Sequence, residues 1–453
     1  MSNTQKKSSI WLKILPATIS QRLYANHSLL AAIKNSGWLM FDKLIRLLLG
    51  LLVSAWVARY LGPAQFGELA YVLAYLAFFQ AVALLGMDGI IVRDIAKDKN
   101  KAGEILGTAF ILRLIVGIFC WLIAIAGMVW SNGWQDRSVY ITALAGVNLI
   151  FQAADTVDLW FQSQSQSRRT VIAKLVSYLV SNGLKVLLIL KGAPLFTFAI
   201  VMSVEALLAM LALVYAYQKY PCQQPWQLLN LRAREMLKES WPFILSGLSI
   251  IVYMRIDQIM IKEILGESEL GVYAAVLPLA MLWTFIPTTL SVSLAPMVAR
   301  AKKQNQHVYW ACLSNIFRGF ALLGWLICIP MFLLSHYVVD FLFGDDYTSG
   351  AQVLSIIIFV NLFINMGVAQ SLWILNEGKS KLSLYKTIFG AIVCVLFNFF
   401  LIPELGITGA AISAVIAQFS SAILANFILC RDVLTLQIKS LFLIKSTVVI
   451  EGG

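Results

Sequence analysis

The chain is short of charge. Asp, Glu, Lys and Arg make up only 13% of its 453 residues, about half of the share that is usual in a soluble domain. Hydrophobic residues make up 60%, and the mean hydropathy is +0.80. Folding such a chain in water would leave more apolar surface than a globule can hide, whereas a lipid bilayer accepts it. A water-soluble protein is therefore excluded.

Residues that usually mark a chemical site are also sparse. The six cysteines show no C-x-x-C spacing, and His27, His307 and His336 lie far apart, so neither a disulfide framework nor a metal site is expected. The G-K-S triplet at 378–380 resembles the end of a phosphate-binding loop, but Trp373 stands where that loop needs its first glycine. We therefore expect no catalytic residue, no metal ligand and no bound cofactor.

Long apolar runs are abundant. About 20 apolar residues in a helix cross ~30 Å of hydrocarbon, whereas the strands of a membrane barrel are shorter and alternate with polar residues. The runs predict an all-α integral membrane protein with twelve transmembrane helices, in two pseudo-symmetric six-helix bundles around a central cavity. They lie near 37–60, 68–87, 105–130, 138–160, 171–191, 194–217, 241–264, 270–298, 308–335, 351–375, 382–402 and 407–430.

The net charge of +12 could indicate binding to nucleic acid, but the cations lie in short clusters between the apolar runs. With the N-terminus inside, the inner segments carry 23 Lys and Arg, and the outer loops carry only four. The positive-inside rule therefore predicts that both ends are cytosolic, and no nucleic acid partner is expected. The outer cations are Arg59, Arg137, Lys191 and Lys262.

The two halves repeat one motif. LGPAQFG at 61–67 reappears as LGESELG at 265–271, at an offset of 204. Six helices per half let both halves enter the membrane in the same direction, related by an axis along the membrane normal. The predicted organisation is a cytosolic basic arm without a cleavable signal peptide (1–36), a first bundle (37–217), a cytosolic linker (218–240), a second bundle (241–430) and a cytosolic tail (431–453).

Thirteen charged residues lie inside the predicted spans. A charge at the bilayer centre costs at least about 2.5–3.5 kcal/mol, so these residues should line a wet cavity or pair with one another. The candidate substrate-binding residues are Arg46, Arg113, Lys185, Arg255 and Arg318, and the candidate coupling or charge-balancing residues are Asp42, Asp155, Glu205 and Asp257.

Simpler interpretations stay open for several of these residues. Lys43, Lys174 and Lys386 lie within about two turns of a cytosolic end, from which their ammonium groups could reach the interface. Asp42 and Arg46 are spaced i,i+4 and could form a purely structural pair. Helix 270–298 contains Pro278, Pro287 and Pro296, which predict a bend that is either a hinge or a static fit.

Seven segments spread over both halves carry a family resemblance: ARYLGPAQFG (58–67), LGMDGIIVRDIA (85–96), RIDQIMI (255–261), LGESELGVYAAV (265–276), FGDDY (343–347), LNEGKSK (375–381) and LIPELGITGAAISAVIA (401–417). In this order they resemble the polysaccharide and O-antigen lipid flippases, a branch of the multidrug/oligosaccharidyl-lipid/polysaccharide exporter superfamily.

The resemblance implies a function. It implies that an undecaprenyl-diphosphate-linked oligosaccharide moves from the cytosolic to the outer leaflet of the bacterial inner membrane by alternating access. It also implies membrane lipids as partners, together with a glycan polymerase and chain-length machinery. The physical chemistry agrees, because a diphosphate is anionic and Arg offers it bidentate hydrogen bonds.

Two other functions remain as alternatives. An ion-coupled exporter of cationic drugs would need an acid-dominated cavity, whereas the spans hold eight bases and five acids. A membrane glycan polymerase or ligase would need a catalytic constellation in a sizeable outer loop. The driving force also stays open between downstream consumption and a proton or sodium gradient that acts through Asp155, Glu205 or Asp257.

Overall fold

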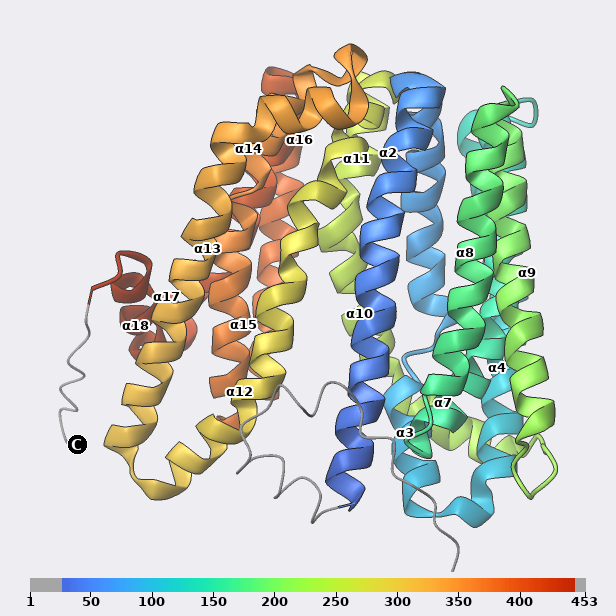
Figure 1. The fold of residues 1–453 in the computed structure, drawn as a ribbon, viewed down its shortest axis with the longest axis horizontal. Coiled ribbons are helices and arrows are strands. Elements are labelled where there is room, and N and C mark those ends of the chain that lie inside the picture. Colours follow the sequence, from blue (N-terminus) through green and yellow to red (C-terminus); the bar gives the residue numbers. More distant parts are fainter. Residues whose placement is uncertain (1–26, 445–453) are drawn as a thin grey trace, which may run out of the picture.

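The computed structural model describes residues 27–444, and in this range the chain is helical and has no strand (Figure 1). The predicted arm before His27 and the tail from 445 onward lie outside the described residues. The first half consists of α2 (His27–Ala83), α3 (Asp88–Lys97), η2 (Lys99–Lys101), α4 (Ala102–Asn132), α5 (Arg137–Gly146), α6 (Asn148–Phe151), η3 (Gln152–Ala154), α7 (Asp155–Ser163), α8 (Arg168–Leu190) and α9 (Leu195–Lys219).

The second half follows a segment without regular structure that ends at α10, whose first turns belong to the predicted linker. It consists of α10 (Asn230–Leu265), α11 (Glu267–Met281), η4 (Leu282–Thr284), α12 (Phe285–Gln304), α13 (Gln306–Phe343), η5 (Asp345–Tyr347), α14 (Ser349–Ile357), α15 (Val360–Glu377), α16 (Ser380–Phe419), η6 (Ser420–Leu424), α17 (Ala425–Leu429) and α18 (Arg431–Leu441).

Nine helices within residues 27–444 are long and apolar enough to cross a membrane. Two of them contain a break at a glycine with positive φ, at Gly62 (72°) in α2 and at Gly406 (63°) in α16, so each covers two of the predicted runs. The predicted run 138–160 is instead divided among α5, α6, η3 and α7. An all-α, multi-pass membrane protein is confirmed, and the number of twelve spans stays a prediction.

The two repeated motifs form equivalent turns. Gly62 has φ 72° and ψ 169°, and Gly266, at the same offset of 204, has φ 96° and ψ 179°. Positive φ is readily adopted only by glycine, so the two copies share a backbone conformation as well as a letter pattern. The end of the molecule that carries both turns is uppermost in Figure 1 and is called the turn end below.

The two motifs touch each other at the turn end. A Cβ added to Gly67 would lie 1.8 Å from the carbonyl oxygen of Glu267, and one added to Gly271 would lie 1.8 Å from the carbonyl oxygen of Pro63. Glu267 is the counterpart of Pro63 at the offset of 204, so the contact is reciprocal. Only glycine at both positions lets α2 and α11 pack this closely.

Two tyrosines also join the halves. Tyr347 is fully buried, and its hydroxyl donates to the carbonyl of Ala58 at 2.7 Å. The hydroxyl of Tyr71 donates to Glu263 at 3.3 Å. Together with the glycine contact, these bonds hold α2 of the first half against the second half.

The helix with three prolines is interrupted. The run predicted for 270–298 is divided by the 3₁₀ turn η4, which begins four residues after Pro278. Pro287 is buried in the first turn of α12, and Pro296 lies further along the same helix. The missing amide donors account for the interruption. Motion at this point stays a prediction.

Candidate functional site

A polar cavity of about 190 Å³ lies inside the first half. A second cavity of about 250 Å³ adjoins it and shares Gln80 and Glu205 with it. The short 3₁₀ turn η3 interrupts the helical run beside the first cavity, and irregular backbone at membrane depth is tolerated where it lines such a space. The charged and amide residues that line the first cavity are Arg46, Gln80, Asn148, Gln152, Asp155, Lys174 and Glu205.

Arg46 is held on two sides within this lining. Its Nε donates to Asp42 at 2.8 Å, and its guanidinium carbon lies 4.8 Å from the ring centre of Tyr178. The Tyr178 hydroxyl donates to the carbonyl of Arg46 at 2.9 Å. Arg46 Nη2 is nevertheless buried and has no hydrogen-bond partner among the described residues. The pair with Asp42 therefore exists and leaves Nη2 of the guanidinium unused.

Lys174 bridges two carboxylates. Its ammonium lies 2.7 Å from Asp155 and 2.9 Å from Asp158. The interpretation that Lys174 extends to the membrane interface stays a prediction, and the structure adds these two partners, which sequence position could not show. The neighbouring Glu205 accepts from Ser181 at 2.6 Å and from Lys185 at 3.4 Å.

The ionic groups of this region are nearly balanced. Every candidate charge-balancing acid of the first half is paired with a cation, and carboxylates outnumber cations by four to three. The cationic surplus of the spans is therefore not located here. Both polar atoms of the Gln152 side chain, which lines the cavity, are buried without a hydrogen-bond partner among residues 27–444.

Most of the surplus lies in the second half, whose predicted spans hold three bases and one acid. Arg255 Nη1 donates to Gln258 at 3.4 Å and forms no ion pair within the described residues. Arg318 donates to the carbonyl of Ser314 at 3.4 Å and to the side chain of Asn315 at 2.6 Å, again without a carboxylate in the part of the chain that the structure describes. Among the described residues, therefore, two guanidinium groups in predicted spans have no carboxylate within ion-pair distance.

Asp257 lies two residues from Arg255 and interacts with its charge, but within the described residues it forms no ion pair with either arginine. It is buried, and it accepts from the hydroxyl of Tyr273 at 2.5 Å and from the backbone N–H of Gln258 at 2.8 Å. Tyr253, on the same face of α10, donates to Gln418 of α16. The sequence left open which face of this helix meets its neighbours, and the structure shows that both do: Tyr253 contacts α16, and Lys262 lies over the ring of Tyr71 in α2.

Arg113 lies away from the cavity. It is fully buried, and its Nη2 donates to Asp88 and, at 3.2 Å, to the carbonyl of Leu84. These contacts fix the break between α2 and α3. Its role in substrate binding stays a prediction.

Lys386 is buried in a socket of amides. Its ammonium donates to the side chain of Gln370 and, at 3.5 Å, to the carbonyl of Ala422 in the π-helix η6. Asn426 donates to Gln370 at 3.1 Å and to Gln437 of α18 at 2.7 Å. This lysine is buried within the protein, and the socket attaches the described part of the predicted tail to the bundle.

We expect Gln370→Leu to destabilise the protein more than Lys386→Met does. Loss of the Gln370 amide leaves the buried ammonium of Lys386 without its closest acceptor. A buried charge that loses its partner lowers the free energy of unfolding by about 3–5 kcal/mol. Loss of the ammonium leaves amides that can bond to one another. Thermal unfolding in detergent measures both, and the double variant should lose less than the sum of the two single losses. An equal or larger loss in Lys386→Met would contradict this account of the socket.

Sequence reasoning missed two residues of the lining and its surroundings. Gln80 lies in an apolar run, and Tyr178 is one aromatic among many, so neither carried a signal. Gln152 did carry one, because it belongs to a polar series at helical spacing with Asn148 and Asp155.

Two known protein families match parts of this chain. The sequence profile of the family described as polysaccharide biosynthesis protein matches residues 32–302, and that of the MatE family matches residues 242–400. The capsular polysaccharide biosynthesis protein CapF of Staphylococcus aureus is 22% identical over 86% of this chain and 97% of its own. A putative O-antigen transporter of Shigella dysenteriae is 22% identical over 81% of this chain and 92% of its own.

Solved structures share the fold. An inward-facing multidrug resistance MATE family transporter of the MOP superfamily superimposes with a TM-score of 0.72 at 17% identity, covering 87% of this chain and 96% of the other. The lipid II flippase MurJ in an inward closed conformation gives a TM-score of 0.69 at 12% identity, covering 90% and 91%.

Proposed function

Because the chain belongs to the polysaccharide biosynthesis protein family, in the polysaccharide transporter branch of its superfamily, we propose that it is a flippase for lipid-linked polysaccharide precursors. Its relatives named as an O-antigen transporter and a capsular polysaccharide biosynthesis protein support this. The substrate in the proposal is an undecaprenyl-diphosphate-linked oligosaccharide, which moves from the cytosolic to the outer leaflet of a bacterial inner membrane. Membrane lipids, a glycan polymerase and chain-length machinery are the proposed partners.

One observation carries the proposal most directly. Arg255 and Arg318 lie in predicted spans, yet within residues 27–444 neither has a carboxylate within ion-pair distance. An arginine without an ion-pair partner is costly at membrane depth and usually marks a function. A diphosphate head group would supply the missing negative charge and accept bidentate hydrogen bonds.

Alternating access is the proposed mechanism. The halves contact each other closely at the turn end, and the η4 interruption gives the second half a place to bend. Opening of the turn end requires the reciprocal glycine contact to separate, and bending at η4 lets the second half move without disrupting its core. The proposed driving force is downstream consumption or a proton or sodium gradient, with Asp155, Glu205 and Asp257 as the acids that could respond to it.

A second candidate is supported by the first-half cavity. Its region carries four carboxylates and three cations, the balance that an exporter of cations would use. The MatE match over 242–400 agrees with this alternative. An exporter of this kind would carry organic cations, which the surplus arginines of the second half oppose.

Reconstitution tests the two candidates. Proteoliposomes should flip an undecaprenyl-diphosphate-linked oligosaccharide, measured by its access to a glycosidase outside, and should not accumulate ethidium. Collapse of a proton or sodium gradient in the same vesicles shows whether either ion drives the step. Ethidium transport without flipping would establish the second candidate instead.

We also propose that the turn end faces outward, because 23 of the Lys and Arg residues flank the opposite face in the predicted topology. In a variant without its native cysteines, Gln135→Cys and Asp346→Cys should react with an impermeant maleimide in intact cells. Gln166→Cys should react only after permeabilisation. The reverse pattern would invert the topology.

A further inference from the structure

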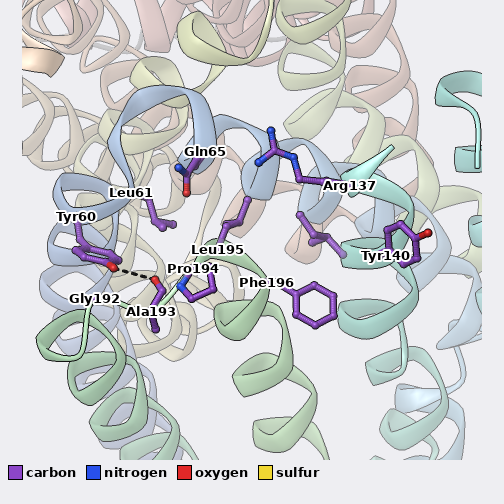
Figure 2. A pocket seen from close by; sticks show the side chains of 11 residues that line it. Tyr60, Leu61, Gln65, Arg137, Tyr140, Gly192, Ala193, Pro194, Leu195 and Phe196 are labelled. Atoms are coloured by element: carbon purple, nitrogen blue, oxygen red, sulfur yellow. Dashed lines mark hydrogen bonds between the residues drawn. The ribbon is translucent and has the colours of Figure 1, made fainter. Parts of the chain in front are cut away.

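A half-open cavity of about 450 Å³ lies at the turn end of the first half, apart from the cavity around Arg46 (Figure 2). It forms where three elements meet, namely the turn of α2, the start of α5 and the loop between α8 and α9. Small-molecule sites commonly have this volume. The side chains used below are Tyr60, Gln65, Arg137, Tyr140 and Phe196.

The cavity is built before any ligand arrives. The hydroxyl of Tyr60 donates to the carbonyl of Ala193 at 2.8 Å, which ties the α8–α9 loop to α2 (Figure 2). Leu61, Ile141 and Leu195 line it as buried side chains. The apolar part of the cavity is therefore fixed, and a ligand need not order the loop.

Its polar and aromatic groups remain available. Arg137 is exposed and has no ion pair among the described residues, while the adjacent Asp136 is engaged as the cap of α5, accepting from Ser138 N at 2.8 Å. Tyr140 and Phe196 are 54% and 45% exposed. Figure 2 shows the Gln65 amide on the same upper side as the Arg137 guanidinium.

This set of groups fits a sugar that carries an acid. The guanidinium can hold a carboxylate through two parallel hydrogen bonds, the amide can bond hydroxyls, and aromatic rings can cover the apolar C–H face of a pyranose. A phospholipid head group fits less well, because surfaces that recognise anionic lipids gather several Lys or Arg, and this lining has one.

The two halves differ at this place, although they share the turn. At the offset of 204, Tyr60 corresponds to Ile264 and Gln65 corresponds to Glu269. The second half thus lacks the hydroxyl that pins the loop and has a carboxylate where the first half has an amide. Glu68 interacts with the charge of Arg137 without forming an ion pair among the described residues, and the uncharged amide adds no second carboxylate from the turn.

We propose that this cavity binds an acidic sugar residue of the translocated glycan after it has reached the outer face. The inference rests on the proposed function for the origin of the sugar and on the proposed orientation. Binding there would hold the glycan away from the interface between the halves, so that the turn end can close behind it.

Saturation-transfer NMR on the protein in nanodiscs tests the site, with D-glucuronate as the probe and D-glucose as its neutral match. Transfer to the ring protons of glucuronate should be strong. The affinity for glucose should be lower by roughly a factor of ten or more. Arg137→Gln should lower glucuronate affinity by a similar factor. Tyr140→Ala should lower it too, whereas Tyr140→Phe should retain it. Arg59→Gln is the matched control at the same end.

Other results would overturn the site. Equal transfer in Arg137→Gln and the wild type would do so, as would displacement of glucuronate by an equal concentration of glycerol 1-phosphate, which would identify a lipid head-group site. The assay needs no transport, so its outcome is separate from that of the proposed function. If the protein binds glucuronate but does not flip the lipid-linked glycan, the proposed site is still supported. If it flips the glycan but does not bind glucuronate, the proposed site is excluded.

Discussion

Alanine in place of Gly67 should prevent the turn end from closing. The new methyl group would lie 1.8 Å from the carbonyl oxygen of Glu267, so the backbone of α2 or α11 would have to move. Overpacking costs typically about 1–3 kcal/mol, and we expect a value near the upper end because the neighbouring atom belongs to the backbone. A cost of about 3 kcal/mol shifts the equilibrium between the closed and the open turn end roughly 150-fold toward the open state. Flipping should fall accordingly. The reciprocal change, Gly271→Ala, should have the same effect.

A buried cysteine can report the change directly. Ala58 is fully buried beneath Tyr347, so Ala58→Cys should react slowly with an impermeant maleimide in the wild type and faster when Gly67→Ala is added. Gly183→Ala is the matched control, because its added methyl group meets no atom within 4 Å. The double variant at Gly67 and Gly271 should be less than additive, since both changes remove one contact. Wild-type flipping in Gly67→Ala would show that this contact does not control the cycle.

Loss of the guanidinium of Arg255 should weaken binding of the diphosphate lipid without changing stability. A charge-assisted hydrogen bond is worth about 1.5–3 kcal/mol, so Arg255→Gln should lower affinity roughly 10- to 150-fold. Arg255→Lys should recover only part of this, because the bidentate fork is lost. Binding of an undecaprenyl-diphosphate oligosaccharide and thermal unfolding, measured on the same preparations, separate the two effects.

Arg46 and Asp42 provide the contrast. Arg46 is paired with Asp42 and packed on Tyr178, and its Nη2 is unused, so Arg46→Gln should lower both stability and affinity. Asp42→Asn should lower stability alone. If Arg46→Gln and Asp42→Asn behaved alike in binding as well as stability, the pair would be purely structural. Normal binding by the Arg46→Gln, Arg255→Gln double variant would defeat the diphosphate hypothesis.

The fold could be predicted largely from the sequence. The thickness of the bilayer sets the length of an apolar run, so the runs identify the helices, and the repeated motif indicates two related halves. The breaks in helices were predictable only where proline or glycine causes them. The interruption at η3 has no proline and follows from the polar cavity beside it. A letter pattern at offset 204 could not show that Gly67 and Gly271 meet in space.

The candidate site was predicted less well, since a sequence shows how deep a charge lies but not what it contacts. Lys174 and Lys386 illustrate this. Both lie near a predicted helix end, yet one bridges Asp155 and Asp158 and the other is enclosed by amides. The ratio of bases to acids over all predicted spans also did not show that the acids are concentrated in the first half.

The contact between the two turns has the form of an isologous interface, in which the same patch on two partners is self-complementary. In each motif one glycine packs against a backbone carbonyl of the other motif. In return, one carbonyl of each motif packs against the glycine of the other. A chain of half this length that carried one copy of the motif could therefore make the same pair of contacts with a second copy of itself. The reciprocity at Gly67 and Gly271 is what fusion of two subunits of such a homodimer into one gene would preserve.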